Sequence, residues 1–264
     1  MKTKHYIILC IAMSGGALSS SLIADVLIYD DFGLPSDPNS NLDGRTPVTG
    51  PNDWYGYSAG SDVGWKVYGG EALLGDLSKN GMAGISMGDD YFSTNPAVYS
   101  LSANLSMTPS TGESWYAIGF NEEFSTSSNT GFYNPDEVEG QPWLFVRNNG
   151  EVQVRYDEDN YMYSGSGFDV SDMNLELILD TSVAQWTVDA YIDGVQLDLN
   201  GAAAGSTYTY STNPSSIGSV GLSGTAGVVG TIQDFTLQTV PEPQAFALLF
   251  GLGALCVVVT RRRR

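Results

Sequence analysis

The sequence predicts an all-β sandwich flanked by two short apolar ends. No long stretch has apolar residues at a 3.6-residue period, and short apolar or alternating runs recur between turns rich in Gly, Ser, Thr and Asn. The 264 residues contain no internal repeat and no interior linker. We therefore expect one large jelly-roll domain over residues 25–239, with a signal helix at 1–24 and a transmembrane helix within 240–264.

The first 24 residues have the features of a secretory signal peptide. Lys2 and Lys4 give a basic start, residues 6–13 are mainly apolar, and small residues precede a cleavage site after Ala24. The alternatives are an N-terminal anchor or a buried helix. The apolar run is short and is followed by Gly and Ser, which favours a signal peptide and hence an exported chain.

The expected strands of the body follow from short runs between turn signals. They lie at 26–29, 64–68, 72–74, 97–106, 114–120, 143–147, 151–156, 174–180, 185–192, 195–199, 217–222 and 230–238. Asn148-Asn149-Gly150 and Asp193-Gly194 predict tight hairpins, because these residues tolerate positive φ. Trp115 and Trp186 lie on strand patterns and are expected in the core. The longest loops are expected at 32–53 and 125–141.

The composition of the body excludes several kinds of chemistry. Residues 25–240 contain neither Cys nor His, so disulfides, Cys or His zinc sites and Ser-His-Asp or Cys-His nucleophiles are absent there. The same residues hold five bases and 29 acids, a net charge of −24 against −19 for the whole chain. Such a surface repels phosphate backbones, which argues against nucleic-acid binding, and suits hard cations such as calcium.

The C-terminal segment has three parts in a fixed order. Pro241-Glu242-Pro243 comes first, followed by an apolar run at 245–259 and by four arginines, Arg261, Arg262, Arg263 and Arg264. The run has 15 residues, fewer than the about 20 of a typical spanning helix, and arginines that snorkel extend it. The terminal arginines would hold the tail on the cytoplasmic side.

This tail resembles the PEP-CTERM sorting signal of Gram-negative bacteria. The resemblance implies recognition and processing by exosortase, a membrane transpeptidase. It also implies delivery through the inner membrane to the cell envelope, outer surface or extracellular matrix, in association with exopolysaccharide and biofilm. The alternative is a simple membrane anchor with an accidental Pro-Glu-Pro.

The body resembles the concanavalin A-like lectin/glucanase sandwich, including laminin-G-like domains. The residues that carry this resemblance are Tyr29-Asp30-Asp31-Phe32, the runs 175–180 and 186–194, and Ile232-Gln233-Asp234-Phe235-Thr236-Leu237. The resemblance implies that the first and last strands lie side by side at an edge.

Glucanases of that fold carry two carboxylates on one strand as Glu-x-Asp-x-Glu or a close variant, which places both on one sheet face. The nearest matches here lie at 136–139 and 157–159, beside Pro, Gly or Asn, and are expected in loops. This departure predicts a protein that is not an enzyme. The alternative is a glycoside hydrolase or lyase with an unusual carboxylate pair.

Aromatic residues in polar, turn-rich surroundings are the candidates for carbohydrate binding, because exposed rings stack on sugar faces. They are Trp54, Tyr55, Tyr57, Tyr161 and Tyr163. The alternative is that these rings fold back onto the sandwich.

Asp30, Asp31 and Asp234 are the candidate metal ligands. If the first and last strands pair, the three carboxylates would approach one another and hold calcium together with backbone oxygens. The alternative is a solvated acidic surface. Together these features predict an exported, non-catalytic protein that binds polysaccharide or serves in adhesion.

Overall fold

The computed structural model describes residues 24–33, 40–58, 64–74, 78–122, 141–156, 161–201, 206–214 and 216–241. The chain divides into two units, one formed by Val26–Gln238 and the other by Met1–Asp25 with Thr239–Arg264. The first unit is the β body, and the following description concerns it.

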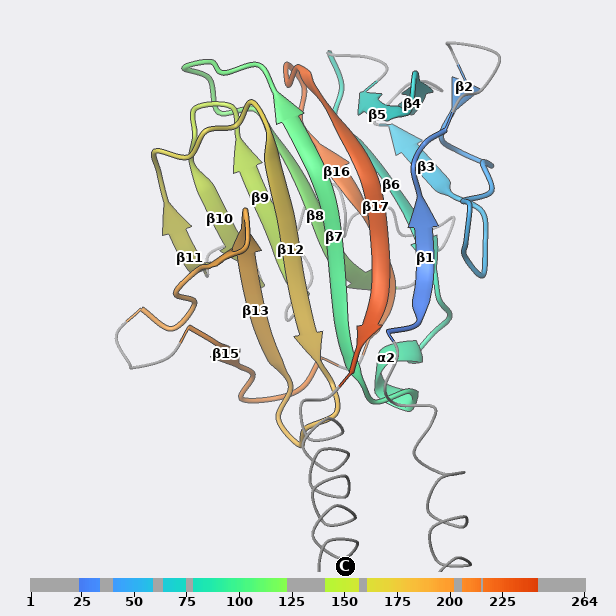
Figure 1. Ribbon diagram of the computed structural model, residues 1–264, viewed down its shortest axis with the longest axis vertical. Coiled ribbons are helices and arrows are strands. Elements are labelled where there is room, and N and C mark those ends of the chain that lie inside the picture. Colours follow the sequence, from blue (N-terminus) through green and yellow to red (C-terminus); the bar gives the residue numbers. More distant parts are fainter. Residues whose placement is uncertain are drawn as a thin grey trace, which may run out of the picture. The chain divides into compact units, whose positions relative to one another are not determined.

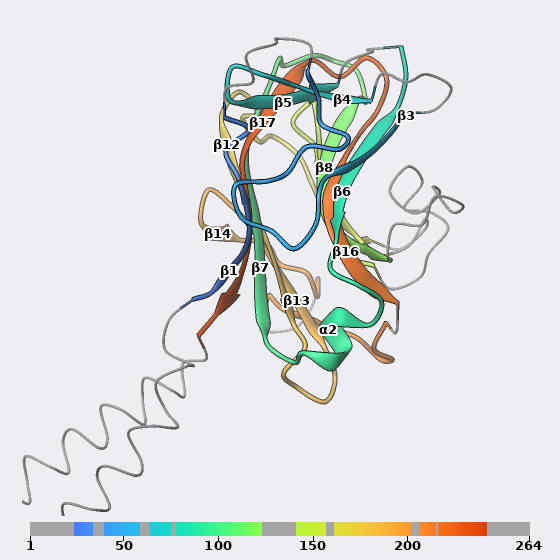
Figure 2. The same cartoon turned by 90° about the vertical axis from the view of Figure 1, so that its right-hand side faces the viewer.

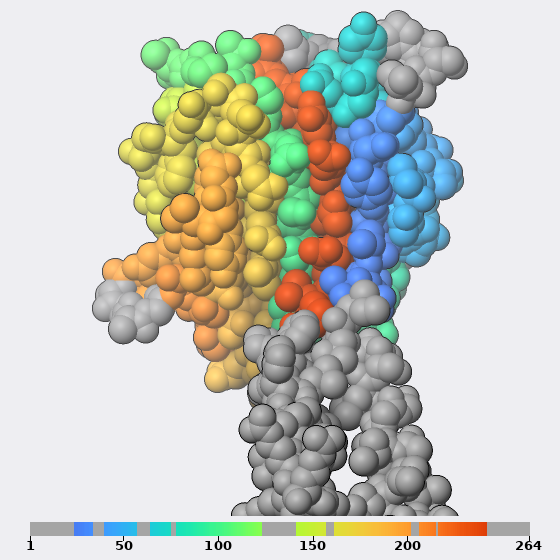
Figure 3. Space-filling model, in the orientation of Figure 1, coloured from blue at the N-terminus to red at the C-terminus, as the bar shows by residue number. Residues whose placement is uncertain are grey.

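One layer of the body is a ten-stranded sheet (Figure 1). Across the sheet its strands are β14 (Val195–Gln196), β13 (Thr187–Ile192), β12 (Met173–Asp180), β7 (Val98–Met107), β17 (Gly230–Val240), β5 (Glu71–Leu74), β4 (Trp65–Tyr68) and β2 (Ser40–Asn41). In addition, β1 (Val26–Asp30) pairs with β17, and β15 (Tyr208–Thr209) pairs with β13. Figure 3 shows β13, β12, β7, β17 and β1 side by side on its outer face.

The second layer is a seven-stranded sheet, seen edge-on against the first in Figure 2. Its order is β11 (Tyr161–Gly165), β10 (Val152–Arg155), β9 (Trp143–Arg147), β8 (Trp115–Glu122), β16 (Ile217–Gly224), β6 (Gly81–Ser86) and β3 (Tyr55–Ser58). A short helix, α2 (Tyr91–Thr94), precedes β7. Two packed antiparallel sheets make the body a jelly-roll sandwich, as the sequence predicts.

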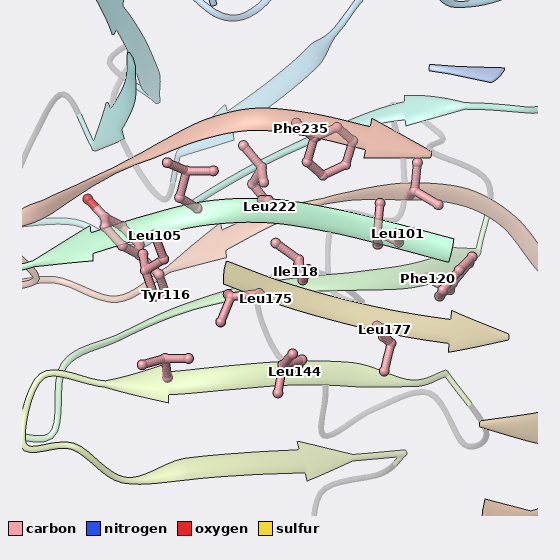
Figure 4. Close-up of a cluster of buried hydrophobic side chains, with 14 of the residues drawn as sticks. Leu101, Leu105, Tyr116, Ile118, Phe120, Leu144, Leu175, Leu177, Leu222 and Phe235 are labelled. Carbon is pink, nitrogen blue, oxygen red and sulfur yellow. The ribbon is translucent and has the colours of Figure 1, made fainter. Parts of the chain in front are cut away.

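The core lies between the two sheets and is built by alternation along the strands (Figure 4). The inward residues of the ten-stranded sheet include Leu101, Leu105, Leu175, Leu177 and Phe235. Those of the seven-stranded sheet include Tyr116, Ile118, Phe120, Leu144 and Leu222. Each of these side chains is at most 1% exposed, and burying one such side chain contributes about 1.5–3 kcal/mol.

The first and last strands lie side by side, as the resemblance implies. β1 pairs antiparallel with β17, with Tyr29 opposite Thr236 and Asp30 opposite Phe235. The two predicted hairpins are also present. Gly150 has φ 83° between β9 and β10, and Asp193 and Gly194 have φ 51° and 74° between β13 and β14.

Several strands of the structure do not show a strand pattern in the sequence. The strands that were not predicted are β2, β3, β6, β11 and β15. Residues 81–86 read Gly-Met-Ala-Gly-Ile-Ser, in which Ile85 is the single β-branched residue and none is aromatic. Trp186 is buried next to β13, as expected, but Trp115 lies on the outer side of β8 and packs outside the main core. The prediction for Trp115 was wrong because its strand carries apolar side chains on both faces.

Candidate functional site

The outer face of the seven-stranded sheet carries an apolar cluster separate from the core. Met82, Ala117, Trp143 and Phe145 form it, and Trp115 packs against it. These residues alternate with inward ones, so they project from β6, β8 and β9 away from the other sheet. The first four are at most 3% exposed, and Trp115 is half-buried. The seven-stranded sheet therefore carries apolar side chains on both faces, and Trp115 is the most accessible member of the outer group.

Aromatic and guanidinium groups form a line across four neighbouring strands of this face. We call it the aromatic ladder: Trp115, Trp143, Phe145, Arg155 and Tyr161. Trp115 meets Phe145 edge-to-face with ring centroids 4.8 Å apart, and the Arg155 guanidinium carbon lies 5.3 Å from the Phe145 ring centre. The same carbon lies 4.5 Å from the Tyr161 ring centre. Such cation–π contacts hold the side chains in fixed positions.

The two arginines of this face are held by neighbouring polar groups. Arg155 donates to Gln153 Oε1 from Nε (2.9 Å) and Nη2 (2.7 Å), and to the Tyr161 hydroxyl (3.0 Å). Arg147 Nη1 lies 3.1 Å from Glu151 Oε2 and 3.8 Å from Glu113 Oε2. Arg147 is therefore paired with two acids, and the contacts of Arg155 include a neutral amide and two aromatic rings.

A glycine makes room for the central ring of the ladder. A Cβ atom added at Gly119 would lie 2.2 Å from Cδ2 of Trp143, which is far inside van der Waals contact. The indole therefore lies directly over the backbone of β8, opposite its cross-strand partner Gly119. Any larger residue at position 119 would displace the Trp143 ring.

Polar side chains occupy the next set of cross-strand neighbours on the same face, which we call a row. Ser219 lies opposite Ser86 on one side and Asn121 on the other. Ser219 Oγ donates to the carbonyl oxygens of Asn121, at 3.3 Å, and of Glu122. Asn121 is 5% exposed, and so is barely in contact with solvent. This row borders the ladder at Gly119 and Trp143.

The structure places the five predicted sugar-binding aromatics in different environments. Trp54 is 1% exposed and packs against Phe235, with ring centroids 5.0 Å apart, so the expected surface role of Trp54 is wrong. Tyr163 lies opposite the inward Val154 and packs against the core, which also contradicts an exposed role. In both cases the apolar ring has a better partner inside the sandwich than in water.

The other three aromatics belong to strands of the seven-stranded sheet. Tyr161 is 47% exposed and forms the end of the aromatic ladder. Tyr55 lies opposite Gly84 in the β3–β6 register, at the far side of the same sheet. Tyr57 lies opposite Met82 in that register, and the structure does not describe the Tyr57 side chain.

The predicted calcium ligands do not converge. Asp30 is fully buried, and its carboxylate accepts two hydrogen bonds from Arg45 and one from Trp54 Nε1, which leaves it no role as a surface metal ligand. Asp31 Oδ1 accepts from the backbone N–H of Gly33 at 2.7 Å. Within the described residues no three His, Cys, Asp or Glu side chains form a group suited to a metal ion.

Asp234 lies on the outer face of the ten-stranded sheet, whereas the Asp30 carboxylate points inward. The carboxylate oxygens of Asp234 accept hydrogen bonds from Asn104 Nδ2 at 2.9 Å and from the Tyr29 hydroxyl at 3.5 Å. Desolvation and then the negative charge of Asp234 raise the pKa of the Tyr29 hydroxyl. Pairing of β1 with β17 therefore brings the strands together but leaves Asp30 and Asp234 on opposite faces.

The residues of this face that the sequence analysis missed are Trp143, Phe145, Arg155 and Asn121. One signal was available: Trp143-Leu144-Phe145-Val146 is apolar at every position, which is typical of a strand buried on both faces. The acidic runs 136–139 and 157–159, weighed as a catalytic pair, lie outside the described residues.

Pro241 is the last described residue, so the rest of the sorting segment, including Glu242, Pro243 and the arginines 261–264, lies outside the described part of the chain. The predicted signal at 1–24 also lies there, apart from Ala24. None of the helices that the structure describes has the length and apolar character needed to cross a membrane.

Comparison with protein families matches residues 239–264 to the PEP-CTERM protein-sorting motif. This motif implies export, sorting to the cell surface and processing by the membrane enzyme exosortase. No curated protein matches the sequence significantly.

Solved structures share the fold of the body. The endo-1,3-beta-glucanase from Streptomyces sioyaensis has a TM-score of 0.53 at 13% identity, over 84% of this chain and 98% of that chain. A protein of unknown function with a galectin-like fold from Bacillus subtilis has a TM-score of 0.52 at 11% identity, over 82% and 98%. Lectin II from Ulex europaeus has a TM-score of 0.46 at 11% identity, over 83% and 98%.

At these identities the similarity concerns the fold alone. In the architecture of its body the chain is thus similar to an endo-1,3-beta-glucanase and to a protein with a galectin-like fold, and its tail matches the PEP-CTERM protein-sorting motif. It carries a PEP-CTERM sorting motif at its C-terminus, preceded by a concanavalin A-like β-sandwich.

Proposed function

We propose that this protein is an exported, non-catalytic carbohydrate-binding protein of the cell surface or extracellular matrix. The binding surface is the outer face of the seven-stranded sheet, and the aromatic ladder is its main contact. The single observation that carries the proposal is this ladder, which crosses β8, β9, β10 and β11 on a face that the second sheet does not cover.

The ladder has the chemistry of a sugar-binding surface. The faces of aromatic rings take up the apolar C–H faces of pyranose rings, while nearby polar groups bind the hydroxyls. Trp115 and Tyr161 lie at its two accessible ends, and Gln153 and Arg155 supply polar atoms between them. Gln153 and Tyr161 already hold the Arg155 side chain, so sugar binding would cost little additional side-chain entropy.

The distribution of charge favours a neutral ligand. The five strands β1, β7, β12, β13 and β17, which lie side by side in Figure 3, contain no Lys or Arg. They do contain Glu176, Asp189 and Asp234, so this part of the ten-stranded sheet is acidic. The body as a whole carries −24. An acidic polysaccharide would be repelled over most of this surface, and repulsion is strongest at low ionic strength.

Carboxylates near the ladder are tied up in ion pairs. Glu151 and Glu113 both approach Arg147, and Glu151 also lies within hydrogen-bonding reach of Gln153 Nε2. In a retaining glycosidase two carboxyl groups flank the scissile bond, one as the nucleophile and one as the acid. Here a single arginine pairs with both acids near the ladder, which supports a binding role over hydrolysis.

The proposal is tested with the full chain purified in detergent micelles on a glycan array, with and without calcium. We expect retention on at least one neutral polysaccharide in both conditions, and no release of reducing sugar from that ligand. Tyr161→Ala, at the exposed end of the ladder, should reduce retention at least fivefold.

Tyr68→Ala is the matched control, because Tyr68 is also an exposed tyrosine but lies on β4 of the other sheet. It should leave retention unchanged. Absence of retention on every glycan would overturn the carbohydrate-binding proposal, and release of reducing sugar would favour a hydrolase.

A further inference from the structure

Asn121 and Gln141 occupy opposite positions on neighbouring segments beside the aromatic ladder. The Phe120 N–H donates to the Pro142 carbonyl oxygen at 3.1 Å, so the β8–β9 ladder continues beyond the Gly119–Trp143 pair. This continuation places Gln141 opposite Asn121. Gln141 lies two residues from the outward Trp143, and Asn121 lies two residues from Gly119, which is opposite Trp143. Since side chains alternate along a strand, both residues belong to the outer face of the sheet. We call Asn121 and Gln141 the amide pair.

Each member of the amide pair has one polar atom without a hydrogen-bond partner. These atoms are Asn121 Oδ1, an acceptor, and Gln141 Nε2, a donor, and the two side chains are 5% and 3% exposed. Buried polar groups are nearly always hydrogen-bonded, because an unmade bond destabilises the fold. An acceptor and a donor that remain unused on adjacent strands indicate a bridging group.

The positions next to the amide pair are occupied by small residues. Ser219 and Ser86 continue the row of Asn121 onto β16 and β6, and Gly221 and Gly84 occupy the adjoining row. We call these four residues the small-residue patch. A sugar ring placed on the patch would meet no side chain larger than serine from these four positions. Tyr55 and Trp143 lie at the two ends of the row that contains Gly84 and Gly221.

We propose that the amide pair and the small-residue patch form a subsite that binds one hydroxyl group of a neutral sugar ring. This inference rests on the carbohydrate-binding function proposed above and specifies its ligand. The hydroxyl donates to Asn121 Oδ1 and accepts from Gln141 Nε2, which satisfies both atoms at once. The adjoining ladder holds the rest of the chain.

The chemistry of the pair selects for hydroxyl groups. A carboxylate has no proton to give to Asn121 Oδ1, and an ammonium has no lone pair for Gln141 Nε2. Only a group that both donates and accepts matches the two atoms. The subsite therefore takes a hydroxyl group in preference to the carboxylate of a uronic acid or the ammonium of an amino sugar. The acidic surroundings of the body disfavour the carboxylate further.

The test uses Asn121→Leu and Gln141→Met, which keep side-chain size and remove the polar atoms. The full chain in detergent micelles is titrated calorimetrically with neutral hexasaccharides (cello-, laminari-, manno- and xylohexaose) and with hexagalacturonate. We expect the wild type to bind at least one neutral probe and each variant to bind it at least tenfold more weakly. Hexagalacturonate should not bind either protein.

Thermal unfolding separates this role from a structural one. Since the two atoms have no partners, neither substitution should lower Tm. Asn104→Leu is the control on the opposite sheet: Asn104 donates to Asp234, so this variant should lower Tm and leave sugar affinity unchanged.

The outcomes are distinct. Unchanged affinity in both amide variants overturns the subsite and leaves the carbohydrate-binding function standing. A Tm lowered by several degrees in both shows that the pair holds a structural water, and also overturns it. If the wild type binds none of the probes, the inference is overturned, and the glycan array decides whether the proposed function fails with it.

Discussion

The carboxylate of Asp30 accepts four hydrogen bonds inside the body: from Arg45 Nε (3.1 Å) and Nη2 (3.0 Å), from Trp54 Nε1 (2.8 Å) and from the backbone N–H of Phe32 (2.9 Å). These bonds tie the end of β1 to the segment that leads into β3. They compensate for the desolvation of the charge, which an unpaired buried carboxylate would not tolerate. Asp30 therefore acts on the site only indirectly, by fixing the chain that carries Tyr55.

Arg45→Met should lower the free energy of unfolding by about 3–5 kcal/mol, because it leaves a buried charge without its partner. Urea unfolding followed by circular dichroism measures the change. Arg147→Met is the control: its ion pairs are partly exposed, and its loss should cost about 0–1 kcal/mol. Equal losses in the two variants would contradict the structural role of the Asp30 pair.

At the scale of single strands, β17 departs from regular inward and outward alternation in its middle. Ile232 and Phe235 are both buried, so Gln233 and Asp234 between them form an extra outward step. Asp234 has φ 50°, a left-handed conformation that Asp and Asn tolerate better than other non-glycine residues. This irregularity lets Phe235 reach Trp54 while Asp234 contacts Asn104 on the outer face.

Asp234→Val should destabilise the body by about 1–2 kcal/mol, because a β-branched residue is strained at positive φ. Asp234→Asn should change stability by less than about 0.5 kcal/mol, since asparagine tolerates the same conformation. Thermal unfolding of the two variants tests this. A valine variant as stable as the wild type would show that the backbone relaxes at this position.

β8 is constrained at Gly119, where the Trp143 indole takes the place of a side chain. Gly119→Ala should destabilise the body by about 1–3 kcal/mol through overpacking. It should also weaken sugar binding, since it shifts the central ring of the ladder. Near-ultraviolet circular dichroism and glycan retention measure the two effects.

Gly112→Ala is the matched glycine control, because a Cβ there meets its nearest neighbour, Asn148 Nδ2, at an ordinary 3.4 Å. It should leave both the dichroism and the retention unchanged. If Gly119→Ala behaved like this control, the position of the Trp143 indole would not depend on the glycine at position 119.

At the scale of the whole body, three tyrosine hydroxyls are removed from solvent. Tyr99, Tyr116 and Tyr210 are at most 3% exposed, and desolvation raises the pKa of each well above its ordinary value. Their neutral forms are favoured in the folded state. This contribution to stability is complete below about pH 10, the pKa of an unfolded tyrosine, and is lost as pH rises above it.

The free energy of unfolding should therefore fall steadily between about pH 10 and pH 12, because the unfolded chain releases tyrosine protons that the folded chain retains. Tyr210→Phe should reduce the steepness of this fall. It should not lower stability at pH 7, since the Tyr210 hydroxyl has no hydrogen-bond partner. Chemical denaturation at a series of pH values tests both statements, and an unchanged steepness would contradict them.

The all-β class and the hairpins at Asn149-Gly150 and Asp193-Gly194 were accessible from the sequence, whereas the pairing of the first and last strands was implied by the resemblance to the concanavalin A-like fold. Turn chemistry and alternation are local properties, so nearby residues report them. The sorting tail was also readable, because its motif, apolar run and basic end are contiguous. β6 was missed, because its glycines and methionine show no strand pattern until β16 and β3 pair with it.

The candidate site depends on which residues meet across strands. The Arg155 guanidinium lies over Phe145 and Tyr161, and Gln141 faces Asn121, only because β8 to β11 pair in one register. Trp54 and Asp30, polar candidates by their neighbours in sequence, are buried together. The sequence by itself determined the fold class and the sorting motif of the tail, through local patterns and contiguous motifs. The tertiary structure alone decided which side chains reach the binding face, because strand register is set by packing between distant segments.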